Sequence, residues 1–169
     1  MHRFIVNSQN IYGQTLEIKG EEARHITKVL RKKIGDQIAV FDGSGKEYLV
    51  EIKQMLNGSV IGAILQETEA DTEPEIEVCL AQCLTKGTKM DFIVQKCTEI
   101  GVTEIMPVES MRTIVHWNSQ KAQEKQERWQ RIAQEAAKQS KRVKVPRVAP
   151  VLPLTEILKL GKGYDLSFM

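Results

Sequence analysis

Residues 76–110 read IEVCLAQCLTKGTKMDFIVQKCTEIGVTEIMPVES, and this stretch decides the fold class of the second half of the chain. It opens with an apolar run over residues 76–85 that suits a buried strand. Residues 90–101 then carry apolar side chains at helical spacing and end in a glycine, and residues 102–110 form a second apolar run. A strand, a helix and a strand in this order predict an α/β domain with a parallel sheet. We expect the helix to bury Met90, Ile93, Val94, Cys97 and Ile100.

The same pattern continues towards Met169. Residues 126–140 predict a second helix, and YDLSFM (residues 164–169) predicts the start of a third strand. Three strands fall short of the five or six that complete a doubly wound sheet. We therefore interpret this domain as the first part of one that a longer polypeptide would complete. The second helix is expected to bury Trp129, Ile132, Ala133, Ala136 and Ala137.

The first 66 or so residues predict a small β-barrel instead. Short alternating runs are separated by turn residues, among them Asp42-Gly43-Ser44-Gly45 and the hairpin signal Asn57-Gly58. Several short strands with such punctuation are typical of a barrel. The expected strands contain RFIV (3–6), TLEI (15–18), QIAVFD (37–42), EYLVEIKQM (47–55) and SVIGAILQE (59–67).

One helix interrupts these strands, over EEARHITKVLRKKIG (residues 21–35). Ile26, Val29, Leu30 and Ile34 repeat at helical spacing and are expected to face the core. Four cations share another side of the helix, with no acid among them. This stripe is either a solvated helix face or a surface for an anionic partner. Its members are Arg24, Lys28, Arg31 and Lys32.

The acidic stretch ETEADTEPE (residues 67–75) lacks periodicity and predicts a linker. We expect an α+β protein of two domains, with the barrel in residues 1–70 and the parallel-sheet domain in residues 71–169.

Composition and cysteine usage narrow the class of protein. No apolar run approaches the roughly 18 residues of a membrane-spanning helix, and the N-terminus lacks the features of a signal peptide. A cytoplasmic protein without a membrane segment is therefore expected. The three cysteines are expected to be small core residues, and the scattered histidines predict no metal site.

Two loops should carry cations to one rim of the parallel sheet. Ligands of such sheets bind beyond the carboxyl ends of the strands, where Lys86, Lys89 and Arg112 lie in this sequence. These side chains could hold phosphates or an electron-rich base, although solvation of the loops also explains them. The second helix adds a polar stripe, which intrahelical ion pairs explain only in part. The stripe contains Arg128, Arg131, Glu135, Gln139 and Arg142.

Several common motifs are absent from the sequence. Residues 43–46 (GSGK) lack the spacing of a P-loop, and no GxGxxG, GxSxG or HExxH motif is present.

Three segments resemble the RsmE family, the 16S rRNA uracil-N3 methyltransferases. EEARHITKVLRKKIGDQIAVFDGSG resembles the family's barrel signature, and LTKGTKMDFIVQKCTEIGVTEIMPVESMRTIV resembles the opening of its catalytic domain. ERWQRIAQEAAKQSKRVKVPRV resembles the helix that follows. The three occur in the family's order and span most of the chain.

The resemblance implies a PUA-like RNA-binding barrel followed by a SPOUT domain, whose trefoil knot binds S-adenosyl-L-methionine. It also implies a homodimer that acts on a uridine of 16S rRNA in the small ribosomal subunit. The family's GPEGG and LG-x-R-x-L-R-x-E-T-A segments are missing here. We therefore expect cofactor-binding residues only beyond Met169, and no methylation by this chain alone. Carried over by position or by charge, the RNA-binding candidates are Arg3, Arg24, His25, Lys28, Arg31, Lys32, Lys86, Lys89, Arg128 and Arg142.

The implied reaction is attack of uracil N3 on the activated methyl group. Uracil N3 holds a proton near neutral pH, and a cation beside the ring carbonyls would favour its loss. Arg112 is the candidate catalytic residue. Two alternatives remain open: a non-catalytic RNA-binding module for ribosome assembly, and a small-molecule enzyme with a basic phosphate pocket.

Overall fold

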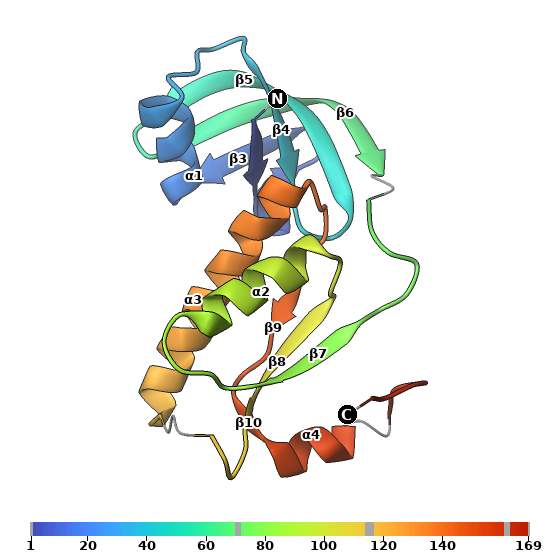
Figure 1. The fold of residues 1–169 in the computed structure, drawn as a ribbon. Helices are drawn as coiled ribbons and strands as arrows, with labels where there is room; N and C mark the ends of the chain where they lie inside the picture. The colour runs from blue at the N-terminus through green and yellow to red at the C-terminus, as the bar shows by residue number, and fades with distance from the viewer. Residues whose placement is uncertain (1, 70–71, 114–116, 161–162, 169) are drawn as a thin grey trace. The chain divides into compact units, whose positions relative to one another are not determined.

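The computed structural model describes residues 2–69, 72–113, 117–160 and 163–168. The chain divides into two compact units (Figure 1). The first unit contains Met1–Glu73 together with Lys141–Lys144, and the second contains Pro74–Ser140 with Val145–Met169. Four residues from late in the sequence therefore belong to the N-terminal unit.

The first unit is a curled sheet around an apolar core (Figure 1). Its described strands follow the order β1-β4-β5-β6-β3-β2, with β1 parallel to β4 and the other neighbours antiparallel. Their bounds are β1 Arg3–Ile5, β2 Ile11–Tyr12, β3 Thr15–Lys19, β4 Gln37–Phe41, β5 Lys46–Leu56 and β6 Ser59–Glu69.

Alternation along β5 and a tight turn set the register of the longest hairpin. Tyr48, Val50 and Ile52 are buried on one face of β5. Gly58 takes φ 92° in the turn, a conformation that favours glycine. On β6, Gly62 faces Val50 so closely that a Cβ would lie 2.2 Å from Val50 Cγ1. A glycine is thus required on β6 where the sheet bends over the core.

The helix of the first unit differs from the expected one. It starts as α1 (Gly20–Arg24) and continues as a π-helical turn, η2 (His25–Val29). Ile26 is fully buried, but Val29 and Ile34 are 67% and 65% exposed, so their assignment to the core was wrong. The wider π-helical turn rotates later side chains away from the face that a regular α-helix would give them.

The second unit contains a parallel sheet, as the sequence predicted. The strands β7 (Cys79–Cys83), β9 (Arg147–Val148) and β10 (Leu152–Pro153) all run parallel to β8 (Glu104–Glu109). The helices are α2 (Lys89–Glu99), α3 (Ser119–Ser140) and α4 (Leu154–Leu160). Figure 1 shows α2 and α3 lying side by side along the sheet, and their contact encloses the main core. This core includes Met90, Val94, Ile105, Trp129 and Ala133.

Three details of the second unit correct the expectations. Ile100 is 78% exposed, because the helix has ended and its side chain leaves the apolar face. Cys83 is exposed, whereas Cys79 and Cys97 are half-buried. Residues 164–168 form no strand; instead Tyr164 forms a hydrogen bond with Cys79, which raises the pKa of Tyr164 to about 12. The predictions for residues 114–116, including His116, lie outside the described residues.

Within the described ranges, no helix is long and apolar enough to cross a membrane. The same ranges bring no three His, Cys, Asp or Glu side chains together as metal ligands.

Candidate nucleic-acid interface

The end of the short helix in the first unit carries a cluster of exposed cations. Arg24, Lys28, Arg31 and Lys33 are exposed, and none forms an ion pair within the part of the chain that the structure describes. Lys32 is half-buried and lies 3.9 Å from Asp36, a long and weak contact. Their positive charge is therefore largely uncompensated, which favours an anionic ligand.

His25 lies beside this cluster with a partly structural role. It is exposed, and its ring contacts the buried Phe4 ring edge-on, with 5.9 Å between the centroids. The ring nitrogens have no hydrogen bond within the described residues.

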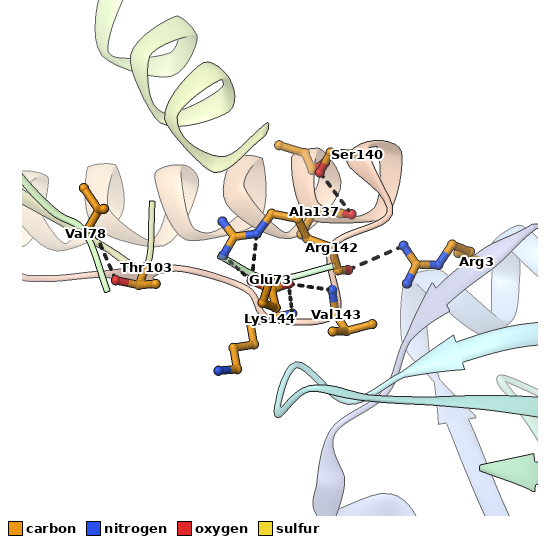
Figure 2. A network of polar contacts seen from close by, with 10 residues as sticks. Arg3, Glu73, Val78, Thr103, Ala137, Ser140, Arg142, Val143 and Lys144 are labelled. Carbon is orange, nitrogen blue, oxygen red and sulfur yellow. Dashed lines mark hydrogen bonds and ion pairs between the residues drawn. The ribbon is translucent and has the colours of Figure 1, made fainter. Parts of the chain in front are cut away.

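Arg3 is engaged inside the first unit. Its Nε donates to Glu47 at 2.8 Å, and its guanidinium lies 4.9 Å from the centroid of the Phe41 ring. Nη1 donates to the backbone oxygen of Arg142 (Figure 2). With only 10% of the side chain exposed, Arg3 holds the sheet together more readily than it could meet a phosphate.

Arg142 is likewise committed, to Glu73. Arg142 is 3% exposed, and its Nε and Nη2 donate to Glu73 at 3.1 and 2.6 Å (Figure 2). Glu73 also accepts from the backbone amides of Val143 and Lys144, both at 3.0 Å. The carboxylate thus fixes the turn after α3 onto the first unit.

The pKa of Glu73 reflects this environment. Burial alone would raise it, but the hydrogen bonds from Arg142 and from two backbone amides outweigh burial. The pKa of Glu73 therefore lies below its usual value, and the carboxylate is ionised near neutral pH. Sequence reasoning had placed Glu73 in a linker, since its partners lie some 70 positions away and no local pattern marks them.

The cation-bearing loops of the second unit begin side by side. Cys83 is paired with Val108 in the parallel register, and the Leu84 amide donates to the Val108 carbonyl at 2.9 Å. The loops of Lys86 and Arg112 therefore leave adjacent strands at the same edge of the sheet. Lys86, Lys89 and Arg112 are all exposed there. Ser110 and Thr113 close the second loop through a hydroxyl contact of 3.0 Å.

Arg128 has a structural partner but remains accessible. Its Nη2 lies 2.7 Å from Asp91, and 54% of its side chain is exposed. Asp91 also accepts from the indole Nε1 of the buried Trp129 at 3.1 Å. Asp91 was not singled out from the sequence, although its position at the start of α2 resembles an ordinary helix-start carboxylate.

Two open grooves flank α3. The larger, of about 870 Å³, follows a glutamine-rich face of the helix beside Pro150 and Val151. The smaller lies between α2 and α3 and is lined by polar side chains and Ile132. These polar side chains are Gln95, Arg128, Arg131, Glu135 and Gln139.

Comparison with known families supports the reading of both units. The family of RNA methyltransferase domains matches residues 72–169, which is more than half of the chain. The chain belongs to the RNA methyltransferase family. A family of RNA methyltransferase PUA domains matches residues 18–65 of the same chain. The two matches occur along the chain in the order that the sequence predicted.

Curated relatives and solved structures agree with this membership. The chain is 37% identical over 110 residues to ribosomal RNA small subunit methyltransferase E of Bacillus subtilis. The matched stretch covers 65% of this chain and 43% of that protein. The Synechocystis protein of the same name is 33% identical over 122 residues, covering 72% and 40%. The chain therefore matches less than half the length of these relatives.

Two solved structures share the fold. The crystal structure of ribosomal RNA small subunit methyltransferase E from Neisseria gonorrhoeae, bound to S-adenosyl methionine, aligns with a TM-score of 0.85 and 35% identity. The alignment covers 94% of this chain and 65% of the Neisseria gonorrhoeae chain. A methyltransferase structure from Legionella pneumophila with bound SAM aligns with a TM-score of 0.84 and 29% identity, covering 93% and 65%.

Proposed function

We propose that this chain belongs to an enzyme that transfers a methyl group from S-adenosyl-L-methionine to N3 of a uridine in 16S rRNA. Residues 1–70 would bind RNA, and residues 71–169 would belong to the catalytic domain. The observation that carries the proposal is the ordered match of a PUA domain and an RNA methyltransferase domain to one chain. The small-subunit substrate is inferred from the names of the curated relatives.

The RNA contacts proposed for each of the two units are its accessible cations. Arg3 and Arg142 are left out because Glu47 and Glu73 engage their guanidinium groups. Phosphate contacts from the remaining side chains would position the RNA with little sequence information. These are Arg24, His25, Lys28, Arg31, Lys32, Lys86, Lys89 and Arg128.

Arg112 is proposed to act on the base. Its exposed side chain follows β8 at the edge where ligands of parallel sheets bind. A guanidinium beside a uracil carbonyl would stabilise the anion left when N3 loses its proton. The lone pair of N3 could then attack the activated methyl group.

Neither of the two grooves beside α3 is an enclosed site of the kind that S-adenosyl-L-methionine would need. Cofactor sites bury most of the ligand in a concave, largely apolar pocket. Both grooves are open, and both are lined mostly by polar side chains of α3. We therefore derive no step through the cofactor from these residues.

Assembly and location follow from the same proposal. We propose a homodimer on the basis of the family resemblance. We also propose that the protein is located in the cytoplasm, because its ribosomal substrate is found there.

RNA binding is tested by the dependence of affinity on salt. Arg24→Gln with Lys28→Gln should weaken binding to 16S rRNA fragments and to unrelated RNA alike. The slope of log affinity against log salt should fall by roughly 0.7–0.9 for each lost phosphate contact. The control removes Lys19 and Lys53 in the same way, since both are paired with neighbouring glutamates. Equal losses in the two double variants would refute this surface.

Catalysis is tested in cells. The gene that contains this sequence, together with any coding sequence that follows residue 169, is expressed in a bacterium that lacks its own uracil-N3 methyltransferase, and N3-methyluridine in 16S rRNA is read by reverse-transcription stops. Restored methylation that is lost in Arg112→Gln supports the enzyme and the role of Arg112. RNA binding without methylation would favour the alternative, a non-catalytic ribosome-assembly module.

A further inference from the structure

The segment Lys28–Ile34 reverses the chain after the π-helical turn of the first unit. The Leu30 amide donates to the His25 carbonyl at 3.0 Å, and the Lys32 amide returns to the Ile26 carbonyl at 3.1 Å. Between these two bonds Arg31 takes φ 50°, in the left-handed region. The backbone is thus fixed in a helix-ending reversal with Arg31 at its corner.

Arginine is an unusual residue for this corner. Helices commonly end with a left-handed residue, and glycine is preferred there because it has no Cβ to strain the conformation. Most other positive-φ positions described in the first unit carry glycine, as at Gly35 and Gly58, and Lys141 (φ 63°), which follows α3, is a second exception. The Arg31 side chain is exposed and has no ion pair within the described residues, so no ion pair in the fold accounts for an arginine at this corner. Strain of this kind that the fold does not use is often found at functional positions.

Two aliphatic side chains are exposed on either side of the corner. Val29 and Ile34 are 67% and 65% exposed, and the cations Lys28 and Lys33 adjoin them in sequence. Cations alone are enough to bind the phosphates of a duplex. A planar guanidinium among aliphatic side chains can instead stack on the exposed face of a base. Such faces are available in unpaired RNA, whereas in a duplex they are covered by neighbouring bases.

We propose that Lys28–Ile34 is the part of the first unit that contacts unpaired RNA, with the Arg31 guanidinium stacked on a base and Val29 and Ile34 packed against neighbouring bases or riboses. This inference rests on the proposed RNA-binding function and adds the structural class of the RNA. Lys28 and Lys33 bind the flanking phosphates. The left-handed backbone of Arg31 is what directs its side chain outwards at the corner.

The test compares an unpaired RNA with a duplex of the same sequence. Fluorescence anisotropy measures binding of the whole chain to a labelled 12-nucleotide single strand and to that strand annealed to its complement. Arg31→Lys keeps the charge but loses the planar stacking surface. It should weaken single-strand binding by about fivefold or more while changing duplex binding by less than about twofold.

Three further variants separate the apolar and backbone contributions. Val29→Ser and Ile34→Ser should each weaken single-strand binding without changing its salt slope, whereas the control Leu65→Ser, an exposed leucine on β6, should not. Arg31→Gly should lose affinity while its melting temperature stays the same or rises, because glycine suits the left-handed corner.

The outcomes distinguish this inference from the proposed function. Wild-type affinity for the single strand in Arg31→Lys and in both serine variants overturns the inference and leaves RNA binding by the cations intact. That result would indicate a ribosomal protein as the partner of the aliphatic pair. Failure of the wild-type chain to bind either RNA would overturn the RNA-binding function itself.

Discussion

Ile26 and Val29 lie three positions apart in one helical segment yet differ completely in burial. Ile26 is fully buried in the core of the first unit, whereas Val29 is 67% exposed. We predict that Ile26→Ala lowers the free energy of unfolding by about 2–5 kcal/mol, through lost burial and the cavity left behind. Val29→Ala should change it by less than about 0.5 kcal/mol. Urea denaturation of both variants checks this, and comparable losses would show that Val29 packs in the core as Ile26 does.

A second prediction at this scale concerns the charge of Glu73. Its pKa in the folded protein is lowered from the ordinary value near 4.5. A lowered pKa stabilises the fold fully above the unfolded value, and this stabilisation is lost as pH falls from there through the folded pKa. Glu73→Gln keeps an acceptor oxygen but removes the charge, so it should be destabilising at pH 7, by roughly 3 kcal/mol if Arg142 remains buried.

Denaturation of wild type and Glu73→Gln from pH 7 to pH 3 measures this difference. The two proteins should converge as pH falls below 4.5. A difference that is constant over the whole range would mean that the charge of Glu73 contributes nothing.

At the scale of elements, Asp91 joins the start of α2 to the middle of α3. It accepts from the indole of Trp129, which is 1% exposed, and pairs with the half-exposed Arg128. We predict that Asp91→Ala costs about 1–3 kcal/mol, because a buried indole N–H loses its partner. Arg128→Gln should cost at most about 1 kcal/mol, as is usual for exposed ion pairs.

Thermal unfolding of the two variants, together with tryptophan fluorescence, tests this ranking. A larger loss in Arg128→Gln than in Asp91→Ala would contradict it and would make the ion pair the main link between the helices.

Glutamines of α3 also hold the short strand β9. Gln126 donates to the Val148 carbonyl at 2.9 Å, and Gln130 both donates to Pro146 and accepts from the Val148 amide. These side chains thus form hydrogen bonds with backbone groups of residues 146 and 148 that such a short strand does not pair with a neighbouring strand. Their polar character in sequence gave no sign of this role, because the strand they contact lies about 20 positions away.

At the scale of the whole molecule, the first unit is not contiguous in sequence. Val143 is fully buried, and Arg142 pairs with Glu73, so Lys141–Lys144 completes this unit. We predict that a fragment of residues 1–73 folds but melts roughly 5–15 °C below the corresponding transition of the whole chain, since it loses the burial of Val143 and the partners of Glu73.

Calorimetry of the fragment and of the whole chain provides the measurement. A variant of the whole chain with Val143→Ala is the matched control and should show part of the loss. Identical transitions in fragment and chain would mean that residues 141–144 contribute no stability.

The sequence by itself determined what depends on neighbouring residues. Alternation along β5 and the Asn57-Gly58 turn predicted the longest hairpin. Helical spacing placed Trp129 and Ala133 on the buried face of α3, and the strand–helix–strand order predicted the parallel sheet. These patterns are local because strands repeat every two residues and helices every 3.6. The basic stripe near Arg31 and the cations that follow β7 and β8 were found in the same way, so the candidate surface was largely visible in the sequence.

Only the tertiary structure decided which charges are free and which apolar side chains are covered. Arg142 and Arg24 are equally basic in sequence, but one is buried against Glu73 and the other is exposed. Ile26 and Ile34 belong to one apolar pattern, but a π-helical turn and the reversal at Arg31 separate their environments. Burial and ion pairing depend on residues distant along the chain, and one extra residue in a helical turn redirects every side chain after it.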